Sequence, residues 1–487
     1  MTHKDMDPSI DAAVSKALSQ LGQTDWQLTD ATRLSGGAIN QNFLIELQTG
    51  QSEPVRWVMR RGQSAAIPGT HSREHEYALF EFAHGLGMVV PKPIALVQTD
   101  DGLVSFFEFR PGQADGRKLV QWLGAGSSSG SESGSEQAVQ TAQTAQTARA
   151  ITRQLGEELG RLHHEEASAL ASNSLGRTLG PRPTNSIAAA MVLLEKSYAC
   201  VGQPSSYLTF ATEQVLQEGR ALAAQRPRSA ASVSHNDFRL GNLMMDPQVG
   251  QLTAVLDWEF AAWGDVMADI GWLTAPCWRF GGHQAVAGFG QLQDLIERVC
   301  QTIDAQQASL LQQRVDRELP FWQRYAHLRW AIIAAQQGER VVPGDAEALE
   351  LTITGCMSAS LVEPVVSFYK GQDVAQMARD QANHANHANH AGGSSDTSVI
   401  DATGVQGDHA DHAVADRLLA EAAAHLKRQL ASQLSGSQKY SALMAANAIR
   451  LARGAMAHHY CDATIKSQED AAIQDLIRDL QIWSFKG

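Results

Sequence analysis

The sequence predicts an α+β protein with two lobes, followed by a separate helical domain. Over residues 1–112, short alternating apolar runs with turn residues between them indicate a small antiparallel sheet and one helix. From residue 150 to 370 the apolar spacing is mainly helical, interrupted by one short hairpin. Two low-complexity stretches, 113–149 and 371–412, separate these lobes from each other and from a predicted helical bundle at 413–487.

Length, composition and charge limit the class of protein. The chain has 487 residues, 44% hydrophobic and 19% charged, which is too long for a single core. The net charge of −13 and the lack of a basic stripe predict no nucleic-acid partner. We find no run of about 18 apolar residues and no signal-peptide core, so we expect no membrane partner and a cytoplasmic location. The five cysteines are scattered without a C-x-x-C pair, which favours unpaired thiols in a reducing compartment.

A glycine pair marks the first candidate binding element. Gly36 and Gly37 lie between two strand-like runs, in a loop that extends to Asn40. Glycine lets backbone N–H groups approach a phosphate closely, so the loop can cover the phosphates of a nucleotide. The same pair also fits an ordinary hairpin turn, and its meaning depends on the residues that follow.

A strand and a helix supply a candidate ion pair. The strand at 56–61 ends with Arg60 and Arg61, and the helix that begins near Ser72 carries Glu76 in its first half. A basic residue on a strand that faces a glutamate on the next helix can form the ion pair that positions ATP phosphates. Either residue alone is more typical of surface charge, so the inference rests on their order in the chain.

The stretch from residue 232 to 269 carries the strongest chemical signal. Asp237 and Asn242 precede a predicted hairpin, 243–256, and Asp257 follows it, which brings all three around one short element. Phosphoryl transfer needs such a set, because one aspartate orients the attacking hydroxyl while an asparagine and a second aspartate hold Mg²⁺ on the phosphates of ATP. The alternative is a hairpin with a purely structural role.

The low-complexity stretches predict little ordered structure. Residues 124–148 contain too few apolar side chains to offset the entropy of ordering, so we expect disorder or fraying. The repeated histidines of 382–391 can bind metal, but their setting favours a linker. Amphipathic patterns at 413–430, 441–458 and 468–483 predict the helices of the C-terminal bundle, for which we infer no function.

These motifs resemble the aminoglycoside-phosphotransferase and choline-kinase group of small-molecule kinases over residues 34–280. The most similar variant is the kinase-like domain found fused to acyl-CoA dehydrogenases. The motifs that carry the resemblance are Gly36-Gly37-Ala38-Ile39-Asn40, Val58-Met59-Arg60-Arg61, His75-Glu76-Tyr77, Val90-Pro91-Lys92-Pro93, His235-Asn236-Asp237-Phe238-Arg239-Leu240-Gly241-Asn242, and Leu256-Asp257-Trp258-Glu259 through Gly264-Asp265 to Asp269. The last two motifs are highly specific in this spacing.

The resemblance implies a bilobal, protein-kinase-like fold that binds ATP and Mg²⁺. It implies the following roles: catalysis by Asp237, metal binding by Asn242 and Asp257, and nucleotide binding by Gly36, Gly37, Asn40, Arg60, Glu76 and the hinge at Glu108 and Phe109. It also implies that His235 braces the loop and that Asp265 and Asp269 cap and anchor the following helix, with a solvated face as the alternative for these two.

Three positions depart from the family pattern. Asn236 stands where glycine is usual, and Val266 where proline is common. Arg60 takes the place of the phosphate-pairing lysine, which preserves the charge but changes its geometry. Arg61 remains an alternative to Arg60, because a shift of one residue in register exchanges the faces of a strand.

The sequence therefore favours an active small-molecule phosphotransferase whose acceptor is a hydroxyl group. The alternative is a catalytically inactive nucleotide-binding or scaffolding module that keeps the fold. A protein kinase is a weaker third option, because the chain lacks an Ala-Pro-Glu motif and leaves little room for a peptide-docking segment after Asp257. The resemblance to the dehydrogenase-fused domains suggests a hydroxyacyl thioester as acceptor, and the wider group takes aminoglycosides, choline and similar alcohols. The sequence does not decide the oligomeric state.

Overall fold

The computed structural model describes residues 7–34, 40–49, 54–62, 67–124, 135–226, 229–246, 249–341 and 348–388. These residues divide into two compact units. The first unit takes in the described residues up to Val201 together with Val215–Arg329, and the second takes in Gly202–Gln214 and the described residues from Trp330 onward. Every motif that carries the predicted chemistry lies in the first unit.

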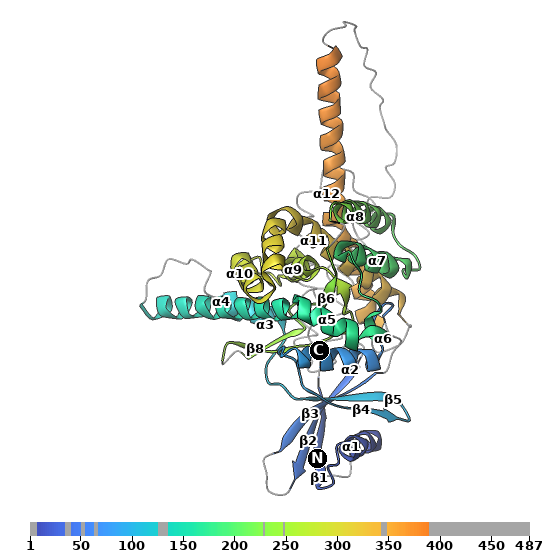
Figure 1. Cartoon of the computed structure of the whole chain (residues 1–487), viewed down its shortest axis with the longest axis vertical. Coiled ribbons are helices and arrows are strands. Elements are labelled where there is room, and N and C mark those ends of the chain that lie inside the picture. Colours follow the sequence, from blue (N-terminus) through green and yellow to red (C-terminus); the bar gives the residue numbers. More distant parts are fainter. Residues whose placement is uncertain are drawn as a thin grey trace, which may run out of the picture. The chain divides into compact units, whose positions relative to one another are not determined.

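An antiparallel sheet of five strands, in the order β1-β2-β3-β5-β4, forms the N-terminal lobe (Figure 1). The strands are β1 (Trp26–Arg33), β2 (Asn40–Thr49), β3 (Val55–Gly62), β4 (Pro93–Thr99) and β5 (Gly102–Glu108). Side chains alternate along a strand, so Trp57 and Met59 of β3 join the buried core with helix α1 (Pro8–Gln20), while Arg60 points to the opposite face. Helix α2 (Arg73–Gly85) packs on β4 and β5. The predicted α+β fold class is confirmed.

The rest of the first unit is mainly helical. Its helices are α3 (Gly116–Gly124), α4 (Ser135–His163), α5 (Glu165–Ser174), α6 (Gly176–Leu179), α7 (Ser186–Ala199), α9 (Val266–Thr274), the short η1 (Pro276–Trp278) and α10 (Leu292–Thr302). Helices α8 (Ser206–Gln225) and α11 (Ala305–Glu339) run on into the second unit, which also contains α12 (Ala348–Ala388). Two strand pairs lie among the helices: β6 (Ser232–Ser234) with β9 (Ala262–Gly264), and the predicted hairpin of β7 (Leu243–Asp246) with β8 (Gln251–Val255).

Gly112 lets the chain between the two lobes pass close to the hairpin. A Cβ atom at this position would lie 2.8 Å from the carbonyl oxygen of Met245, and the backbone φ is 136°. The next residue, Gln113, forms two backbone hydrogen bonds with Met245 of β7, each 2.9 Å long. Only glycine combines this conformation with such a close approach.

The structure differs from the expectation for the low-complexity stretches. Helix α4 begins at Ser135, so 135–148 is helical, and α12 continues to Ala388 through part of the predicted linker. Alanine and glutamine are good helix formers, and the first stretch leads directly into the buried stripe of Ile151, Leu155 and Leu159. The remainder of the linker and the predicted bundle at 413–487 lie outside the described residues, and the domain boundaries stay a prediction.

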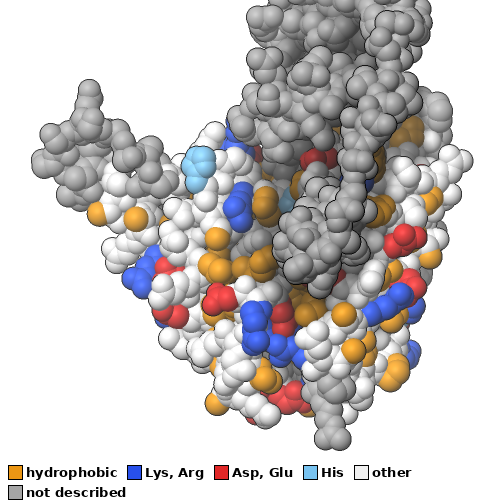
Figure 2. All heavy atoms as spheres, turned by 90° about the horizontal axis from the view of Figure 1, so that it is seen from above, with side chains coloured by type: hydrophobic (Ala, Val, Ile, Leu, Met, Phe, Trp, Pro, Cys, Tyr) orange, Lys and Arg blue, Asp and Glu red, His pale blue; other side chains and the backbone are white. Residues whose placement is uncertain are grey.

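One helical segment of the described chain, Leu351–Gln372 in α12, is long and apolar enough to cross a membrane by length and composition. The segment is not one unbroken apolar run, because polar residues such as Glu363 lie within it. Leu361, Val362 and Val365 are buried, and a single helix of this kind is weak evidence for a membrane span. On the described surface seen in Figure 2, acidic and basic side chains are interspersed with apolar ones.

Candidate active site

The loop after β6 holds the predicted catalytic aspartate in a fixed conformation. His235 is buried; its Nδ1 accepts a hydrogen bond from the backbone N–H of Asp237 (3.2 Å), and its Nε2 lies 3.0 Å from the carbonyl oxygen of Leu256. These contacts assign the hydrogen to Nε2, and burial lowers the pKa of His235, so the ring is neutral. The expectation that His235 braces the loop is confirmed.

Asn236 explains a departure from the family pattern. Its φ is 62°, in the left-handed region that glycine adopts without cost and that asparagine tolerates better than most residues. A glycine would adopt this backbone freely, and asparagine is one of the few other residues that tolerate it.

Three donors from the protein hold the carboxylate of Asp237. Arg239 Nε (2.8 Å) and Trp272 Nε1 (3.0 Å) both donate to Oδ1, and Asn242 Nδ2 donates to Oδ2 (2.6 Å). Asp237 is only 6% exposed, and these three donors provide the hydrogen bonds that a buried carboxyl group needs. The sequence analysis did not assign roles to Arg239 or Trp272. Arg239 lies two residues after Asp237 within a recognised motif, but no local pattern connects Trp272 with the loop.

Asn242 and Asp257 flank the hairpin as expected. The carbonyl oxygen of Asn242 accepts from the backbone N–H of Leu256 (2.8 Å), which ties the two ends of the hairpin together. Asp257 follows β8 with a φ of 66°, and its side chain is 34% exposed. A non-glycine residue in this conformation costs roughly 1–3 kcal/mol, and such strain concentrates at functional sites.

The donor set fits Mg²⁺. Because the Nδ2 of Asn242 is used by Asp237, its Oδ1 is turned away from that bond, and among the described residues only Arg60 pairs with Asp257, through Oδ1. Two protein oxygens suit Mg²⁺, which keeps water and phosphate as its other ligands. Within the described part of the chain no group of three His, Cys, Asp or Glu side chains is arranged to hold a metal, so a site there depends on the asparagine.

Arg60 connects the two lobes. Its Nη1 lies 2.8 Å from Glu76 on α2, and its Nη2 lies 2.9 Å from Asp257. Burial alone would lower the pKa of Arg60, but the two carboxylates outweigh this effect and raise it. Arg61 points the other way and donates to Gln41 and Ser9. Of the two arginines, the structure thus brings Arg60 to the candidate site.

Glu259 adds a carboxyl group that the sequence analysis did not consider. Burial, together with the nearby charges of Asp257 and Glu76, raises the pKa of Glu259 to about 8, although Arg60 opposes the shift. Asp257, Glu76 and Glu259 thus gather around Arg60, and the Arg73 guanidinium interacts with the two glutamates as well.

The structure describes some of the remaining residues that were predicted to bind the nucleotide. Glu108 ends β5, and its backbone N–H donates to the carbonyl oxygen of Lys92 (2.9 Å); the N–H of Phe109 donates to that of Arg56 (3.1 Å). The N–H groups of these two residues are therefore already used by hydrogen bonds within the protein. Asn40 opens β2 opposite Gly62. Gly36 and Gly37 lie outside the described residues.

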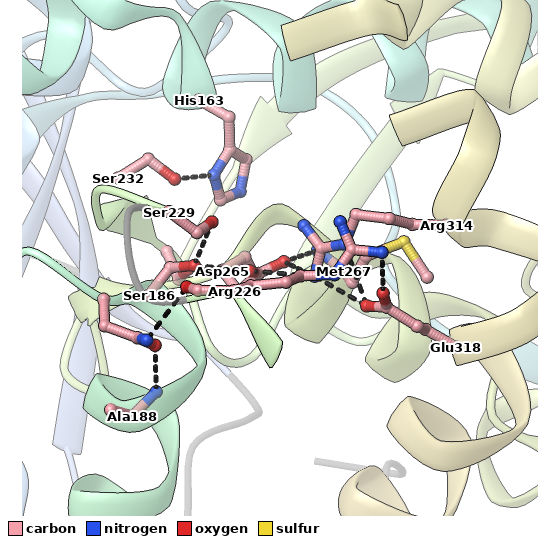
Figure 3. Close-up of polar contacts among 12 residues, drawn as sticks. His163, Ser186, Ala188, Arg226, Ser229, Ser232, Asp265, Met267, Arg314 and Glu318 are labelled. Carbon is pink, nitrogen blue, oxygen red and sulfur yellow. Dashed lines mark hydrogen bonds and ion pairs between the residues drawn. The ribbon is translucent and has the colours of Figure 1, made fainter. Parts of the chain in front are cut away.

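A buried polar network anchors α9 behind the loop. Asp265 caps α9 by accepting from the backbone N–H of Met267 (2.9 Å), and it also accepts from Ser186 (2.5 Å) and Arg314 (2.9 Å). Glu318 lies one turn from Arg314 on α11 and pairs with it (2.8 Å), and Figure 3 shows Ser186, Asp265 and Arg314 meeting from α7, the start of α9 and α11. Burial would raise the pKa of Asp265, but Arg314 and Ser186 outweigh burial and lower it.

The second aspartate of this motif holds the loop backbone. Asp269 is fully buried and accepts from the backbone N–H groups of His235 and Asn236, both at 2.8 Å. His163 Nε2 lies 3.0 Å from the same carboxylate and its Nδ1 lies 2.5 Å from Ser232 Oγ. The expectation that Asp265 and Asp269 cap and anchor this helix is confirmed.

Comparison with known proteins identifies the family of this chain. The model of the phosphotransferase enzyme family (APH) matches residues 30–301, which is more than half of the chain. The chain belongs to this family. Phosphotransferases of this family are small-molecule kinases that bind ATP or ADP.

Individual relatives are distant. The chain is 24% identical over 241 residues to acyl-CoA dehydrogenase family member 10 of Mus musculus, covering 47% of this chain and 20% of the relative. It is 22% identical over 335 residues to family member 11 of Rattus norvegicus, covering 67% and 38%. It thus spans only a fifth to two fifths of these relatives. An ethanolamine kinase structure from Plasmodium vivax has 14% identity and a TM-score of 0.46, covering 74% of this chain and 89% of that one.

Proposed function

We propose that this protein is an ATP- and Mg²⁺-dependent phosphotransferase that transfers the γ-phosphate of ATP to a hydroxyl group of a small molecule. One observation carries the proposal: two sets of contacts meet at the ends of one hairpin. Ion pairs join Glu76, Arg60 and Asp257, and hydrogen bonds join Asn242 to Asp237. The backbone N–H of Leu256, the residue before Asp257, donates to the carbonyl oxygen of Asn242 and so brings the two sets together. A structural hairpin does not require a cross-lobe arginine.

In this reaction, Asp237 orients the acceptor hydroxyl in line with the γ-phosphate. A phosphoryl transition state is loose, so positioning matters more than base strength. Oδ1 of Asp237 already accepts from two donors, which leaves Oδ2, beside its bond to Asn242, to accept from the hydroxyl. Arg60 meets the phosphates with its planar fork. Asn242 and Asp257 would hold Mg²⁺, which neutralises charge on the phosphates.

The relatives favour one class of acceptor. The two mammalian relatives described above are acyl-CoA dehydrogenase family members, which supports a hydroxyacyl-CoA thioester over cationic aminoglycosides or choline.

An ATP-consumption screen tests the proposal. The protein would be incubated with Mg²⁺ and ATP against hydroxyacyl-CoAs, amino alcohols and aminoglycosides, and phosphorylated products identified by mass spectrometry. We expect turnover with at least one hydroxyl acceptor, and highest kcat/KM with the hydroxyacyl-CoAs. ATP binding without transfer to any acceptor or to water would instead support the non-catalytic nucleotide-binding module.

A further inference from the structure

Trp272 contacts the reacting carboxylate from the helix that also fixes its loop. Asp269 and Trp272 are three residues apart on α9 and therefore lie on one face of the helix. Asp269 accepts the backbone N–H groups of His235 and Asn236, and Trp272 donates to Asp237 Oδ1 at 3.0 Å. A single helical face thus sets both the backbone and the side chain of this loop.

The indole of Trp272 is held in place on several sides. The residue is 2% exposed, and its ring lies 4.9 Å from the Arg329 guanidinium and 5.6 Å from the ring of Trp278. Arg329 in turn donates to the carbonyl oxygen of Asn236. The ring cannot turn without disturbing these contacts, so the direction of its N–H is set by packing.

Other tryptophans show that the fold does not require this hydrogen bond for burial. The Nε1 atoms of Trp258 and Trp322 are also buried, and among the described residues neither has a hydrogen-bond partner. Burial of a tryptophan in this protein therefore does not depend on a hydrogen bond from its indole N–H to another described residue. The N–H of Trp272 is satisfied by the one carboxylate that the reaction uses.

We propose that Trp272 is a positioning residue for phosphoryl transfer. With Arg239, it commits Oδ1 of Asp237 to protein donors and fixes the rotation of the carboxylate, so that Oδ2 faces the acceptor hydroxyl. This inference rests on the proposed function, because the positioned oxygen matters only if Asp237 meets an acceptor. It assigns Trp272 a role in turnover and none in nucleotide binding.

The test is Trp272→Phe, which keeps an aromatic ring and removes the N–H. Losing a hydrogen bond to a charged group should lower kcat roughly tenfold to a hundredfold. The affinity for Mg²⁺-ATP should stay within about twofold, because Trp272 contacts none of the groups placed at the phosphates. Trp322→Phe is the matched control: it removes the same atoms from a buried tryptophan whose N–H has no described partner, and it should retain kcat within about twofold.

A spectroscopic readout tests the contact without turnover. The indole N–H resonance of Trp272, assigned by its loss in Trp272→Phe, should move upfield in Asp237→Ala, because a carboxylate acceptor holds it downfield. Equal kcat in Trp272→Phe and Trp322→Phe, or an indole resonance unchanged in Asp237→Ala, would overturn the inference. If the wild-type protein turns over no acceptor, the proposed function fails, while the resonance still shows whether Trp272 binds Asp237.

Discussion

Asp257 and Asp265 lie eight positions apart in one motif and have opposite environments. Asp257 has a side chain that is 34% exposed and pairs with one arginine from the other lobe. Asp265 is 2% exposed and accepts from a serine, an arginine and a backbone N–H group. A carboxylate whose acceptor sites are filled by the protein can only stabilise the fold, whereas one with an oxygen left over can bind a ligand.

The backbone conformations of Asp257 and Asp265 also differ. Asp265 has a φ of −117°, the ordinary extended conformation of a helix N-cap, while Asp257 has a φ of 66°. The fold stabilises Asp265 and strains Asp257. The comparison predicts that changes near Asp237 and Asp257 affect turnover and nucleotide binding, and that changes near Asp265 affect stability.

The largest expected effect belongs to Asp237→Asn. The variant should lower turnover by roughly two to four powers of ten, which is the usual scale for losing a positioned general base. The reason is that an amide cannot take up the proton of the acceptor hydroxyl as a carboxylate can. ATP affinity should stay nearly unchanged, since the described contacts of Asp237 are to the protein. Steady-state kinetics with a hit from the screen, or with water as acceptor, measures it. A fully active Asp237→Asn enzyme would remove this residue from catalysis.

Arg314→Met should lower the stability of the protein, because Arg314 belongs to the buried polar network around Asp265 and not to the candidate active site. It leaves Asp265 buried without its cation, while Glu318 keeps its ion pair with Arg226, and the loss should cost about 3–5 kcal/mol in the free energy of unfolding. Urea denaturation measures this loss. The control is Arg317→Met, an exposed neighbour that donates to the backbone carbonyl oxygen of Gln313, and its free energy of unfolding should stay within about 0.5 kcal/mol of the wild type.

The same pair gives a pH dependence. The pKa of Asp265 is lowered in the folded protein, so its contribution is present above the unfolded pKa of about 4 and is lost as pH falls through the lower, folded value. The difference between wild type and Arg314→Met should therefore shrink on acidification below about pH 4. If the difference in the free energy of unfolding between wild type and Arg314→Met stays constant down to low pH, the stabilisation by Arg314 does not come from the ionised Asp265.

Arg60→Lys should have an intermediate effect on nucleotide binding. Lysine keeps the charge but cannot bridge Glu76 and Asp257 with a planar fork, so the Kd for Mg²⁺-ATP should rise by up to about tenfold. Arg61→Lys is the matched control on the other face of β3 and should leave the Kd unchanged. Calorimetry that shows the larger effect for Arg61 would reverse the assignment of faces.

The smallest effect is expected for Asn236→Gly. Glycine adopts a φ of 62° freely, so the variant should change the free energy of unfolding by less than about 1 kcal/mol, whereas Asn236→Ala should cost about 1–2 kcal/mol. Thermal or urea denaturation of the two variants side by side measures the difference. Equal stability of the alanine and glycine variants would show that the positive φ carries no cost at this position.

The sequence predicted the parts of the site that depend on local pattern. The alternation of β3 and its order before α2 led to Arg60 and Glu76, and the spacing around the hairpin led to Asp237, Asn242 and Asp257. It could not choose between Arg60 and Arg61, because a register is set by pairing with β2 and β5. Trp272 was missed for a related reason: its contact with Asp237 joins elements 35 residues apart through the packing of α9. The helical conformation of residues 135–148 was missed because their low complexity suggested disorder, although alanine and glutamine have a high helix propensity.

The central claim is that Asp257 and Asn242 form the metal-dependent nucleotide site. Calorimetric titration of ATP into the wild-type protein and into Asp257→Ala, each with and without Mg²⁺, tests it most directly, with Asp101→Ala in the turn between β4 and β5 as a control. We predict that Mg²⁺ strengthens ATP binding in the wild type and in the control, and that this dependence disappears in Asp257→Ala. Equal ATP affinity with and without Mg²⁺ in the wild type, or an unchanged metal dependence in Asp257→Ala, would contradict the claim.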